Sequence, residues 1–379
     1  MSTPSFDYAI IGAGAAGLHL AVQIANEPTL AAKKVLILDK DAKESNDRTW
    51  SFWEEGTSEL DSIAARTWNK VVFHSSSERH EVPLNNYHYK TIRSSDFYRW
   101  AKEKIHASGQ FTWITDPIKE VKDQEIIGVQ GSYRANHVFD SRVSKAFEEE
   151  KAQHVSLVQH FLGWFIETPE PVFNDEEVIV MDYRIKWKDQ TSFNYVLPFS
   201  PTSALIEFTL FNKELLQESE YEEILKQYIT ERLGIQDFSI VEKEIGQIPM
   251  STYPFVKHHT KHHTKIGTAG GWVRPSSGYS FKNAERYSIQ IVKNLKNGSA
   301  PARGVATNRF RFYDKIFLQV LRERNDMGEE IFETLYTKPS IETLFRFMDE
   351  QSNFLEELRI MFSLDKPIFR KALIQSLFS

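Results

Sequence analysis

The sequence predicts an α/β fold in which a Rossmann-type domain carries an inserted antiparallel-sheet domain and is followed by C-terminal helices. The first observation behind this prediction is a glycine-rich turn between a short apolar strand and a helix near the N-terminus. The second is the period-two alternation of apolar residues between Gln159 and Phe211. The third is the three-to-four spacing of apolar residues from Arg303 onward, which is typical of helices.

The glycine-rich turn has the spacing of a dinucleotide-binding fingerprint. Gly12, Gly14 and Gly17 follow the apolar run Tyr8–Ile11, and residues with helical spacing come next. The first glycine permits the turn, the second lets the backbone approach a pyrophosphate, and the third lets the helix pack close to the strand. A second apolar strand ends in Asp39, where a carboxylate accepts hydrogen bonds from ribose hydroxyls. We therefore predict a bound dinucleotide whose ribose lacks a 2′-phosphate; the alternative is a glycine-rich turn of a core helix.

The composition excludes several classes of function. The chain has 379 residues, enough for two domains or for one domain with an insertion, and its net charge of −6 gives no global field for nucleic acid. The absence of cysteine excludes disulfides, thiolate catalysis and cysteine-ligated metal centres, and it fits a cytoplasmic setting. No window of about 20 residues is apolar enough to span a bilayer. The 27 Phe, 14 Tyr and 8 Trp suit a long apolar cavity, a membrane face or an ordinary core.

Aromatic residues and an Asp–Arg pair are concentrated in Asn46–Trp53, where the first domain turns toward the far end of its cofactor. A packed loop with an internal ion pair is the alternative. Ser94 or Ser95 is expected to cap the helix that follows. Short strands are expected over Val71–Phe73, His80–Val82, Thr91–Ile92, Phe111–Ile114, Glu125–Val129 and His137–Asp140. Asp140 and Arg142 then lie near the cofactor or form a surface ion pair.

The alternating segment predicts a substrate domain built on an antiparallel sheet. Its strands are expected over Phe161–Glu167, Val178–Asp182, Tyr183–Trp187, Ser192–Leu197 and Ala204–Phe211. Glu207 is the only charge in the last of these strands, which is apolar on both faces. A buried carboxylate needs a partner or a raised pKa, and such groups cluster at sites that move protons. The alternative is an edge strand with Glu207 at its rim or paired with Arg184 or Lys186. The same argument applies less strongly to Asp182, which ends the apolar run of its strand.

A second glycine-rich turn, Gly267–Phe281, leads into a helix expected over about Asn283–Leu295. The positive end of that helix would favour a negative charge on a cofactor, although a simple glycine-rich cap is the alternative. The histidine pairs of His258–Thr264 come just before this turn. Neighbouring residues on an extended segment point to opposite faces and no carboxylates are interleaved, so a solvated loop is predicted here and no metal site.

The C-terminal region is predicted to be helical throughout. Helices are expected over Tyr313–Arg324, Ile331–Tyr336, Ile341–Met348, Phe354–Phe362 and Phe369–Phe378. Between Lys282 and Arg324 there are ten Lys or Arg and three acidic residues. Such a basic surface beside aromatic helix faces is compatible with anionic lipid, and a solvated helix face is an equal alternative.

Eight sequence motifs follow one another along the chain between Tyr8 and about Ala284. They are GAGAAG, DRTWSFW at Asp47–Trp53, FDSR at Phe139–Arg142, QHFLGWFIE at Gln159–Glu167, MDYR at Met181–Arg184, YVLPFSPTSALIEFT at Tyr195–Thr209, the Glu244–Gly246–Pro249 segment and GWVRPSSGYS at Gly271–Ser280. In these motifs the chain resembles the flavin-dependent lycopene cyclases of the bacterial β-cyclase type, which are akin to the plant enzymes.

This resemblance implies a p-hydroxybenzoate-hydroxylase-like fold that binds FAD, with NAD(P)H as the reductant and a peripheral position on the cytoplasmic face of a membrane. The domains it implies are an FAD-binding part over 1–75, mixed segments over 76–165, a substrate domain over 166–243, a second FAD-binding part over 244–298 and a helical region over 299–379. The cofactor contacts it implies are Gly12, Gly14, Gly17, Asp39, Arg48, Asp140, Gly267, Gly270, Gly271, Pro275, Gly278 and Tyr279.

The implied reaction is a redox-neutral cyclisation of the linear ends of lycopene to β-ionone rings, which gives γ-carotene and β-carotene and uses reduced FAD. Glu207 takes the place of the family's acidic motif and would deliver or relay the proton, while Phe208 replaces a second Glu of the plant motif and leaves any second acid role to Asp182. The aromatic residues that would shield the cation are Trp50, Phe52, Trp53 and Trp272.

Two other functions stay open, because a cofactor fingerprint reports binding and not chemistry. One is an FAD-dependent monooxygenase or an isoprenoid or carotenoid reductase of the same fold. The other is a non-catalytic flavin-binding partner of a membrane.

Overall fold

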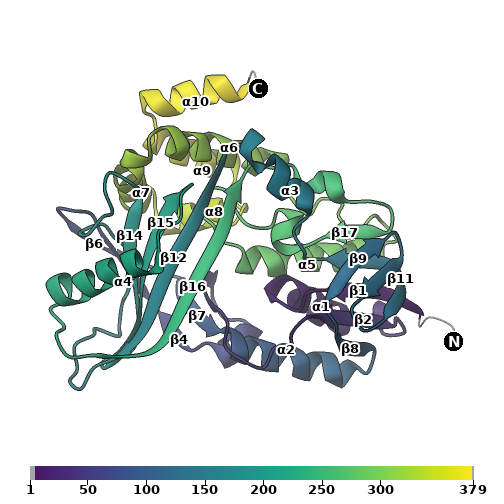
Figure 1. Cartoon of the computed structure of the whole chain (residues 1–379). Helices are drawn as coiled ribbons and strands as arrows, with labels where there is room; N and C mark the ends of the chain where they lie inside the picture. The colour runs from purple at the N-terminus through teal and green to yellow at the C-terminus, as the bar shows by residue number, and fades with distance from the viewer. Residues whose placement is uncertain (1–4, 378–379) are drawn as a thin grey trace.

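The computed structural model describes residues 5–377 and confirms the predicted α/β class (Figure 1). A mostly parallel sheet lies at one end of the molecule. Its strand order is β8-β2-β1-β11-β10-β9, with β17 paired to β11. The strands are β1 (Ser5–Ile11), β2 (Val35–Asp39), β8 (Phe111–Thr115), β9 (Ile118–Lys122), β10 (Glu125–Gly128), β11 (Ser132–Asp140) and β17 (His263–Lys265). We call this the Rossmann sheet, because β8, β2, β1, β11 and β17 run parallel.

Three helices form one packed layer beside the Rossmann sheet. Helix α1 (Ala15–Asn26) contacts both α2 (Ser94–Ser108) and α5 (Phe281–Lys296), and the shared core includes Leu18, Phe97 and Ile291. The predicted serine cap of α2 is wrong, because Arg93 occupies the N-cap position. The Oγ of Ser94 instead accepts hydrogen bonds from the backbone N–H groups of residues 47 and 48, so it fixes the loop before β3.

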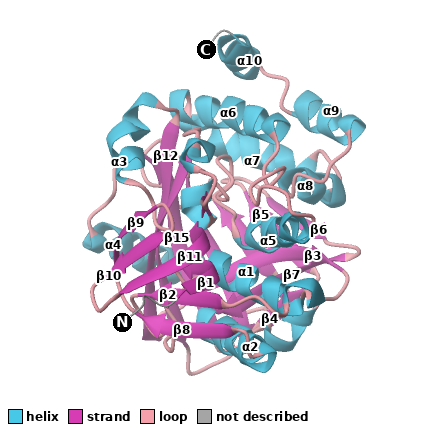
Figure 2. Ribbon diagram, turned by 90° about the vertical axis from the view of Figure 1, so that its right-hand side faces the viewer, coloured by secondary structure: helices cyan, strands magenta, loops and turns pink. Residues whose placement is uncertain are grey.

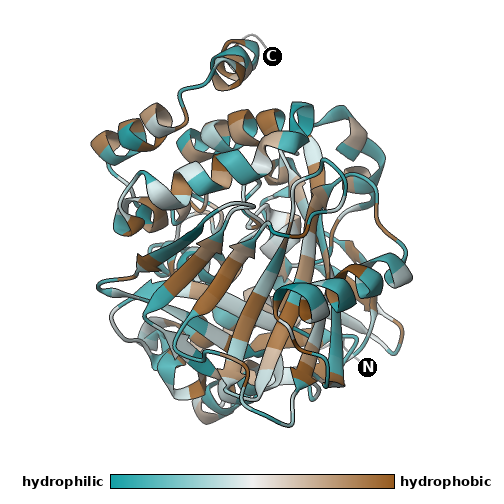
Figure 3. Cartoon of the chain, turned by 90° about the vertical axis from the view of Figure 1, so that its left-hand side faces the viewer, coloured by the Kyte–Doolittle hydropathy of each residue, from teal (hydrophilic) through white to brown (hydrophobic). Residues whose placement is uncertain are grey.

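We call the second large sheet the substrate-domain sheet, after the domain that the sequence predicts there, and its strand order is β16-β12-β15-β14-β13-β5-β6. Its strands are β5 (Lys70–His74), β6 (Arg79–Pro83), β12 (Ser156–Glu167), β13 (Val178–Asp182), β14 (Ser192–Ser200), β15 (Ser203–Asn212) and β16 (Ser239–Ser251). β12, β13, β14 and β15 confirm the predicted alternation, and β15 lies in the interior of the sheet. Helix α4 (Glu218–Gln227) lies across the apolar face shown in Figure 3.

The predicted strand Tyr183–Trp187 is wrong. The Oδ1 of Asp182 accepts a hydrogen bond from the backbone N–H of Arg184 at 3.0 Å, and this side-chain turn ends the ladder after β13. The segment up to β14 is a loop of turns and bends.

A small third sheet lies between the two large ones. Its order is β3-β7-β4, with β3 (Thr49–Glu55), β4 (Arg66–Trp68) and β7 (Tyr87–Arg93). The aromatic segment that the sequence singles out is therefore largely strand β3. This places its residues between the Rossmann sheet and the substrate-domain sheet, where the candidate site is found.

Helices form the C-terminal region, as predicted. They are α6 (Asn308–Glu323), α7 (Gly328–Thr337), α8 (Ile341–Met348), α9 (Phe354–Ser363) and α10 (Pro367–Leu377). These helices cover one end of the substrate-domain sheet, and α10 projects beyond the rest of the molecule while packing on α6 (Figure 2). Among residues 5–377, no helix is both long and apolar enough to cross a membrane.

Candidate active site

The first glycine-rich turn has the geometry that the fingerprint requires. Gly12 has φ +95°, and a Cβ placed there would collide with the side chain of Ser141. A Cβ on Gly17 would collide with the carbonyl oxygen of Gly12, so only glycine lets α1 pack this close to the turn. Both positions therefore exclude a side chain.

Gly14 differs from the other two glycines because it faces open space. A Cβ placed on it would meet no atom within 4 Å. Gly14 is also the N-cap of α1, where no side chain caps the helix and no acidic residue lies in the first turn. Uncapped N–H groups at a helix start bind phosphate oxygens well, so this cradle fits the pyrophosphate of FAD.

Asp39 lies beside this cradle. Its Oδ2 accepts a hydrogen bond from the backbone N–H of Ala13 at 2.6 Å, and its Oδ1 accepts one from Asp41 at 3.0 Å. The carboxylate at the end of β2 thus stabilises the conformation of the glycine-rich fingerprint loop. The predicted contact between Asp39 and a ribose stays a prediction.

Asp140 and Arg48 are engaged with the protein itself. Burial alone would raise the pKa of the Asp140 carboxyl, but hydrogen bonds from His263 and Arg142 and the charge of Lys265 hold it well below its ordinary value. Lys265 Nζ lies 2.9 Å from this carboxylate and joins β17 to β11. Arg48 is exposed and donates to the backbone carbonyl of Asp47 at 2.6 Å. These contacts favour a structural role for each of the two residues. Their predicted roles in binding the cofactor stay predictions.

The second glycine-rich turn packs against the first. Gly267 has φ +60°, and a Cβ there would lie 3.0 Å from Cβ of Ala16 in the first turn of α1. Gly270 and Gly271 continue the turn, and a Cβ on either would crowd backbone or side-chain atoms. The two glycine-rich segments, far apart in sequence, therefore meet at one place, as a shared cofactor site requires.

The end of this turn faces β12. A Cβ on Gly278, which has φ +73°, would collide with the side-chain oxygen of Gln159. That oxygen and the Oγ of Ser277 are buried without a hydrogen-bond partner, and Pro275 is half-buried beside them. Unpaired buried polar atoms are costly unless a ligand satisfies them, so this wall fits the polar edge of a flavin ring.

Glu207 lies in the interior of the substrate-domain sheet. It is in register with Gly163 of β12 on one side and with Tyr195 of β14 on the other. The alternative partners are occupied elsewhere, since Arg184 binds Asp182 and Lys186 binds Glu329 at 2.7 Å. The edge-strand alternative is therefore wrong.

The surroundings of Glu207 favour its protonated form. Desolvation and the charge of Glu244 raise the pKa of Glu207 to about 8, and only the hydroxyl of Thr209, which donates to Oε1 at 2.9 Å, acts in the opposite direction. A carboxyl with this pKa carries its proton at neutral pH. Glu207 can therefore act as a general acid.

Glu244 is a site residue that the sequence reasoning missed. It belongs to β16 and lies in register with Gly163, on the opposite side from Glu207. The sequence shows the segment EIGQIPM, residues 244–250, only as a motif, because nothing in it indicates which strand this segment pairs with. The register of β16 against β12 supplies that information.

Three buried tyrosine hydroxyls form a chain next to Glu207. Tyr89 Oη lies 2.7 Å from Tyr195 Oη and 3.2 Å from Tyr279 Oη. Burial raises the pKa of all three hydroxyls well above the ordinary value, so they stay protonated. The residues come from β7, β14 and the second glycine-rich turn, and they join three parts of the fold at one point.

An apolar cavity of about 300 Å³ extends from Tyr279 toward the C-terminal helices. Its wall includes Phe211, which lies on the same face of β15 as Glu207. The aromatic residues that line it are Phe211, Tyr279, Phe312, Tyr313, Phe317, Phe332, Tyr336, Phe347, Phe362 and Phe369. The helical spacing of those that belong to the C-terminal helices is visible in the sequence, but spacing alone does not distinguish a cavity wall from a core.

The aromatic residues predicted to shield a cation lie in two places. Trp53 stacks on Phe345 and packs edge-on against Tyr279, close to the cavity. Trp50 and Phe52 pack on Phe281 in the core beside α1, and Trp272 is buried in the same core. Trp53 is thus the member of this group nearest to the cavity wall.

Asp182 is fully buried at the end of β13. It accepts hydrogen bonds from the guanidinium of Arg184 and from the hydroxyl of Tyr228 at 2.7 Å. These donors occupy both carboxylate oxygens. These hydrogen bonds favour a structural role for Asp182. They do not support its predicted role in proton transfer.

Comparison with known proteins identifies the family of this chain. The family model described as "Lycopene cyclase protein" matches residues 7–374. The chain belongs to the lycopene cyclase family. The lycopene beta-cyclase of Paracoccus sp. (strain N81106 / MBIC 01143) is 24% identical over 314 residues, which cover 78% of this chain and 74% of the relative.

Solved structures show that the fold is shared with flavin enzymes. A geranylgeranyl bacteriochlorophyll reductase-like protein from Thermoplasma acidophilum has a TM-score of 0.64 at 13% identity and covers 98% of this chain and 99% of its own. A mutant of the halogenase PltM, solved in complex with FAD, has a TM-score of 0.61 at 13% identity, and the match covers 98% of this chain and 90% of that chain. This lycopene cyclase family member therefore has the fold of FAD-binding oxidoreductases, as predicted.

Proposed function

We propose that this chain is a lycopene β-cyclase that converts the linear ends of lycopene to β-ionone rings, with Glu207 as the general acid. The observation that carries the proposal is the position of Glu207, a carboxyl with a pKa of about 8 on the sheet face that leads to an apolar cavity. Membership of the lycopene cyclase family supports the substrate class.

The proposed reaction adds one proton and removes another, so no electrons are transferred overall. Glu207 protonates the terminal alkene of the linear carotene, and a tertiary cation forms. The internal alkene then attacks that cation and closes the ring. Loss of a proton from a neighbouring carbon to water leaves the β-ring, and the Glu207 carboxylate takes up a proton from water before the next turnover.

We propose FAD as the cofactor and NAD(P)H as its reductant. When bound in its reduced anionic form, the flavin supplies negative charge that stabilises a cation. Gly14 and the start of α1 hold the pyrophosphate, and the wall of Gln159, Ser277 and Gly278 orients the ring. The aromatic cavity wall excludes water, and Trp53 and Tyr279 present their rings near the reacting end.

An isotope experiment tests this proposal. Chemically reduced enzyme is incubated with lycopene in D₂O without oxygen, and the products are analysed by mass spectrometry while flavin absorbance is followed. We expect one deuterium in each new ring and no oxidation of the flavin, because the proton added to the alkene comes from an acid in exchange with water. Rings that contain no deuterium would contradict the proposal.

The second candidate is a monooxygenase or a carotenoid reductase, which the shared fold with reductase-like and halogenase structures favours. The same experiment separates the two candidates. A reductase would oxidise one flavin for each product and add two hydrogens, and a monooxygenase would form product only after oxygen is admitted.

A membrane surface is the proposed partner of the C-terminal helices. Several apolar side chains of α9 and α10 are exposed, namely Phe354, Leu355, Phe362, Leu373, Ile374 and Leu377. Phe362 and Leu373 also line the cavity, so its mouth opens among these residues. Arg370 and Lys371 lie on the same helices and suit anionic headgroups. We therefore propose that the enzyme acts as a peripheral protein of the cytoplasmic side and takes lycopene from the lipid.

A further inference from the structure

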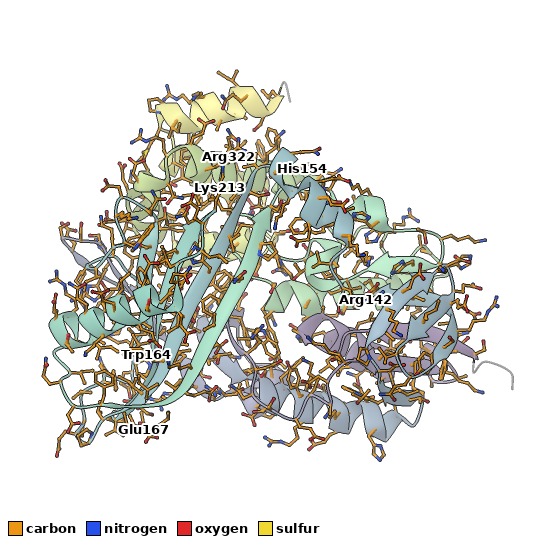
Figure 4. The ribbon with its side chains drawn as sticks, viewed as in Figure 1. Arg142, His154, Trp164, Glu167, Lys213 and Arg322 are labelled. Atoms are coloured by element: carbon orange, nitrogen blue, oxygen red, sulfur yellow. The ribbon has the colours of Figure 1, made fainter. Side chains whose placement is uncertain are left out.

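Gly163 separates two carboxyl groups on one face of the substrate-domain sheet. It pairs with Glu207 of β15 on one side and with Glu244 of β16 on the other, so all three residues lie in one row across the strands. Directly paired residues of antiparallel strands point to the same face. Strand β12, on which Gly163 lies, runs from near the labelled His154 to Glu167 in Figure 4.

The absence of a side chain at Gly163 leaves the space between the two carboxyl groups open. A Cβ placed there would lie 2.9 Å from Leu205 Cδ1 and 3.4 Å and 3.5 Å from Cβ and Cγ of Glu207. A Cβ at this position would require Leu205 Cδ1 to shift, and it would fill the space directly against the side chain of Glu207 at van der Waals distance. Gly163 lets Glu207 and Glu244 act on one another.

The two carboxyl groups have different partners. Burial raises the pKa of Glu244, but the hydrogen bond that its Oε1 accepts from the backbone N–H of Thr49 at 3.0 Å and the positive charges of Arg48 and Arg93 act in the opposite direction. Its Oε2 is buried without a hydrogen-bond partner. Glu207 accepts only from the hydroxyl of Thr209, and no ion pair of Glu207 is found among residues 5–377.

These differences indicate which of the two carboxyl groups is protonated. Backbone N–H donors and nearby guanidinium groups stabilise the ionised form of a carboxyl, whereas an uncompensated position favours the protonated form. The charge of Glu244 is one of the causes that raise the pKa of Glu207, so the state in which both carboxyl groups are ionised is disfavoured. We propose that Glu207 and Glu244 share one proton across Gly163, with Glu244 as the ionised positioning residue that keeps Glu207 protonated. The catalytic part of this statement rests on the proposed function.

The other groups that face this pair do not change the direction of the effect. Tyr195 of β14 and Tyr279 of the second glycine-rich turn stay neutral, because burial raises the pKa of both hydroxyls. Arg48 and Arg93 act on Glu244 from the side of the small sheet. Removal of the Glu244 charge therefore lowers the pKa of Glu207, and Glu207 then loses its proton at a lower pH.

Infrared spectroscopy of the purified FAD-loaded protein tests the pair without any turnover. The carbonyl stretch of a protonated carboxylic acid is followed from about pH 6 to pH 10, and the part that is absent in Glu207→Gln is assigned to Glu207. We expect this signal to titrate at a pH about one unit lower in Glu244→Gln than in the wild type. Glu167→Gln is the matched control, since Glu167 is an exposed glutamate at the end of β12, the strand that carries Gly163, and it should leave the titration unchanged.

Two further variants separate the effect of the Glu244 charge from a structural role of its side chain. Glu244→Asp retains the charge and should restore a titration near that of the wild type, which a purely structural role of the side chain would not explain. Gly163→Ala fills the gap and should change the Glu207 signal while FAD stays bound. An unchanged Glu207 titration in a folded Glu244→Gln protein would overturn the proposal.

Activity measurements separate this proposal from the proposed function. With lycopene as substrate, the alkaline loss of kcat in Glu244→Gln should move to lower pH by the same amount as the infrared titration, with KM little changed. An infrared shift in a protein that forms no ring from lycopene would contradict the cyclase function and leave the pair supported. Ring formation with identical infrared titrations in both proteins would contradict the pair alone.

Discussion

The chemistry proposed for Glu207 depends on a single side chain that can hold and release a proton. Glu207→Gln keeps the shape and the hydrogen bond from Thr209 but removes the acid. We expect product formation from lycopene to fall by about 10²-fold or more while flavin content stays near that of the wild type. Products are measured by chromatography. Glu167→Gln, a change of an exposed glutamate at the end of β12, is the matched control and should retain full activity.

The same residue gives the stability of the protein a pH dependence. Because the pKa of Glu207 is raised to about 8, the folded state binds this proton more tightly than the unfolded state, and stability falls as the pH rises from about 4.5 to 8. Glu207→Gln should therefore raise the Tm relative to the wild type at pH 9, and the difference should vanish near pH 4. Thermal unfolding followed by circular dichroism measures this. A constant difference at all pH values would argue against a raised pKa.

A substitution at Gly14 tests the predicted binding of the FAD pyrophosphate. Because no atom lies within 4 Å of a Cβ placed there, Gly14→Val should fold normally but fill the space of the pyrophosphate. We expect the purified variant to lose its yellow colour, measured by flavin absorbance and circular dichroism. A variant that keeps stoichiometric flavin would contradict the fingerprint assignment.

At the scale of elements, one buried ion pair joins the second glycine-rich turn to α6 and α8. Arg274 Nε lies 2.9 Å from Asp314 Oδ1, and its Nη1 donates to the backbone carbonyls of Phe347 and Met348 at 2.8 Å. Asp314→Ala leaves the guanidinium buried and unpaired, so we expect a loss of about 3–5 kcal/mol in the free energy of unfolding. Urea unfolding measures it. Asp326→Ala, which breaks an exposed ion pair with Arg324, is the control and should leave stability nearly unchanged.

At the scale of the whole molecule, α9 and α10 expose apolar side chains, two of which, Phe362 and Leu373, also line the cavity. Phe362 is 72% exposed and Ile374 is 58% exposed. Replacement of both by serine should lower binding to vesicles of phosphatidylglycerol and phosphatidylcholine by at least about tenfold, because each side chain loses apolar burial in the lipid. Flotation measures the bound fraction. Val241→Ser, a change of a 57% exposed residue on β16, is the control, and an equal loss in that variant would contradict the assigned surface.

Elements with strong local patterns could be predicted from the amino-acid sequence alone. The strand, turn and helix around Gly12–Gly17 were predictable because fingerprint glycines and apolar periodicity are local properties. The helices from α6 to α10 followed from their three-to-four spacing, and Glu207 was recognised because a single charge in an apolar strand has few satisfactory environments. The side-chain turn at Asp182 was missed because a short polar residue competes with the strand ladder without changing the apolar pattern.

Which residues from distant segments lie next to one another could be seen only in the folded chain. The pairing of Glu207 and Glu244 across Gly163 depends on the register of three strands, and a shift of one residue would turn these side chains to the other face of the sheet. The meeting of Gly267 with Ala16 depends on contacts between segments far apart in the chain. The aromatic residues of α6 have the same spacing whether they fill a core or line a cavity, and only the packing of all the elements together distinguishes the two.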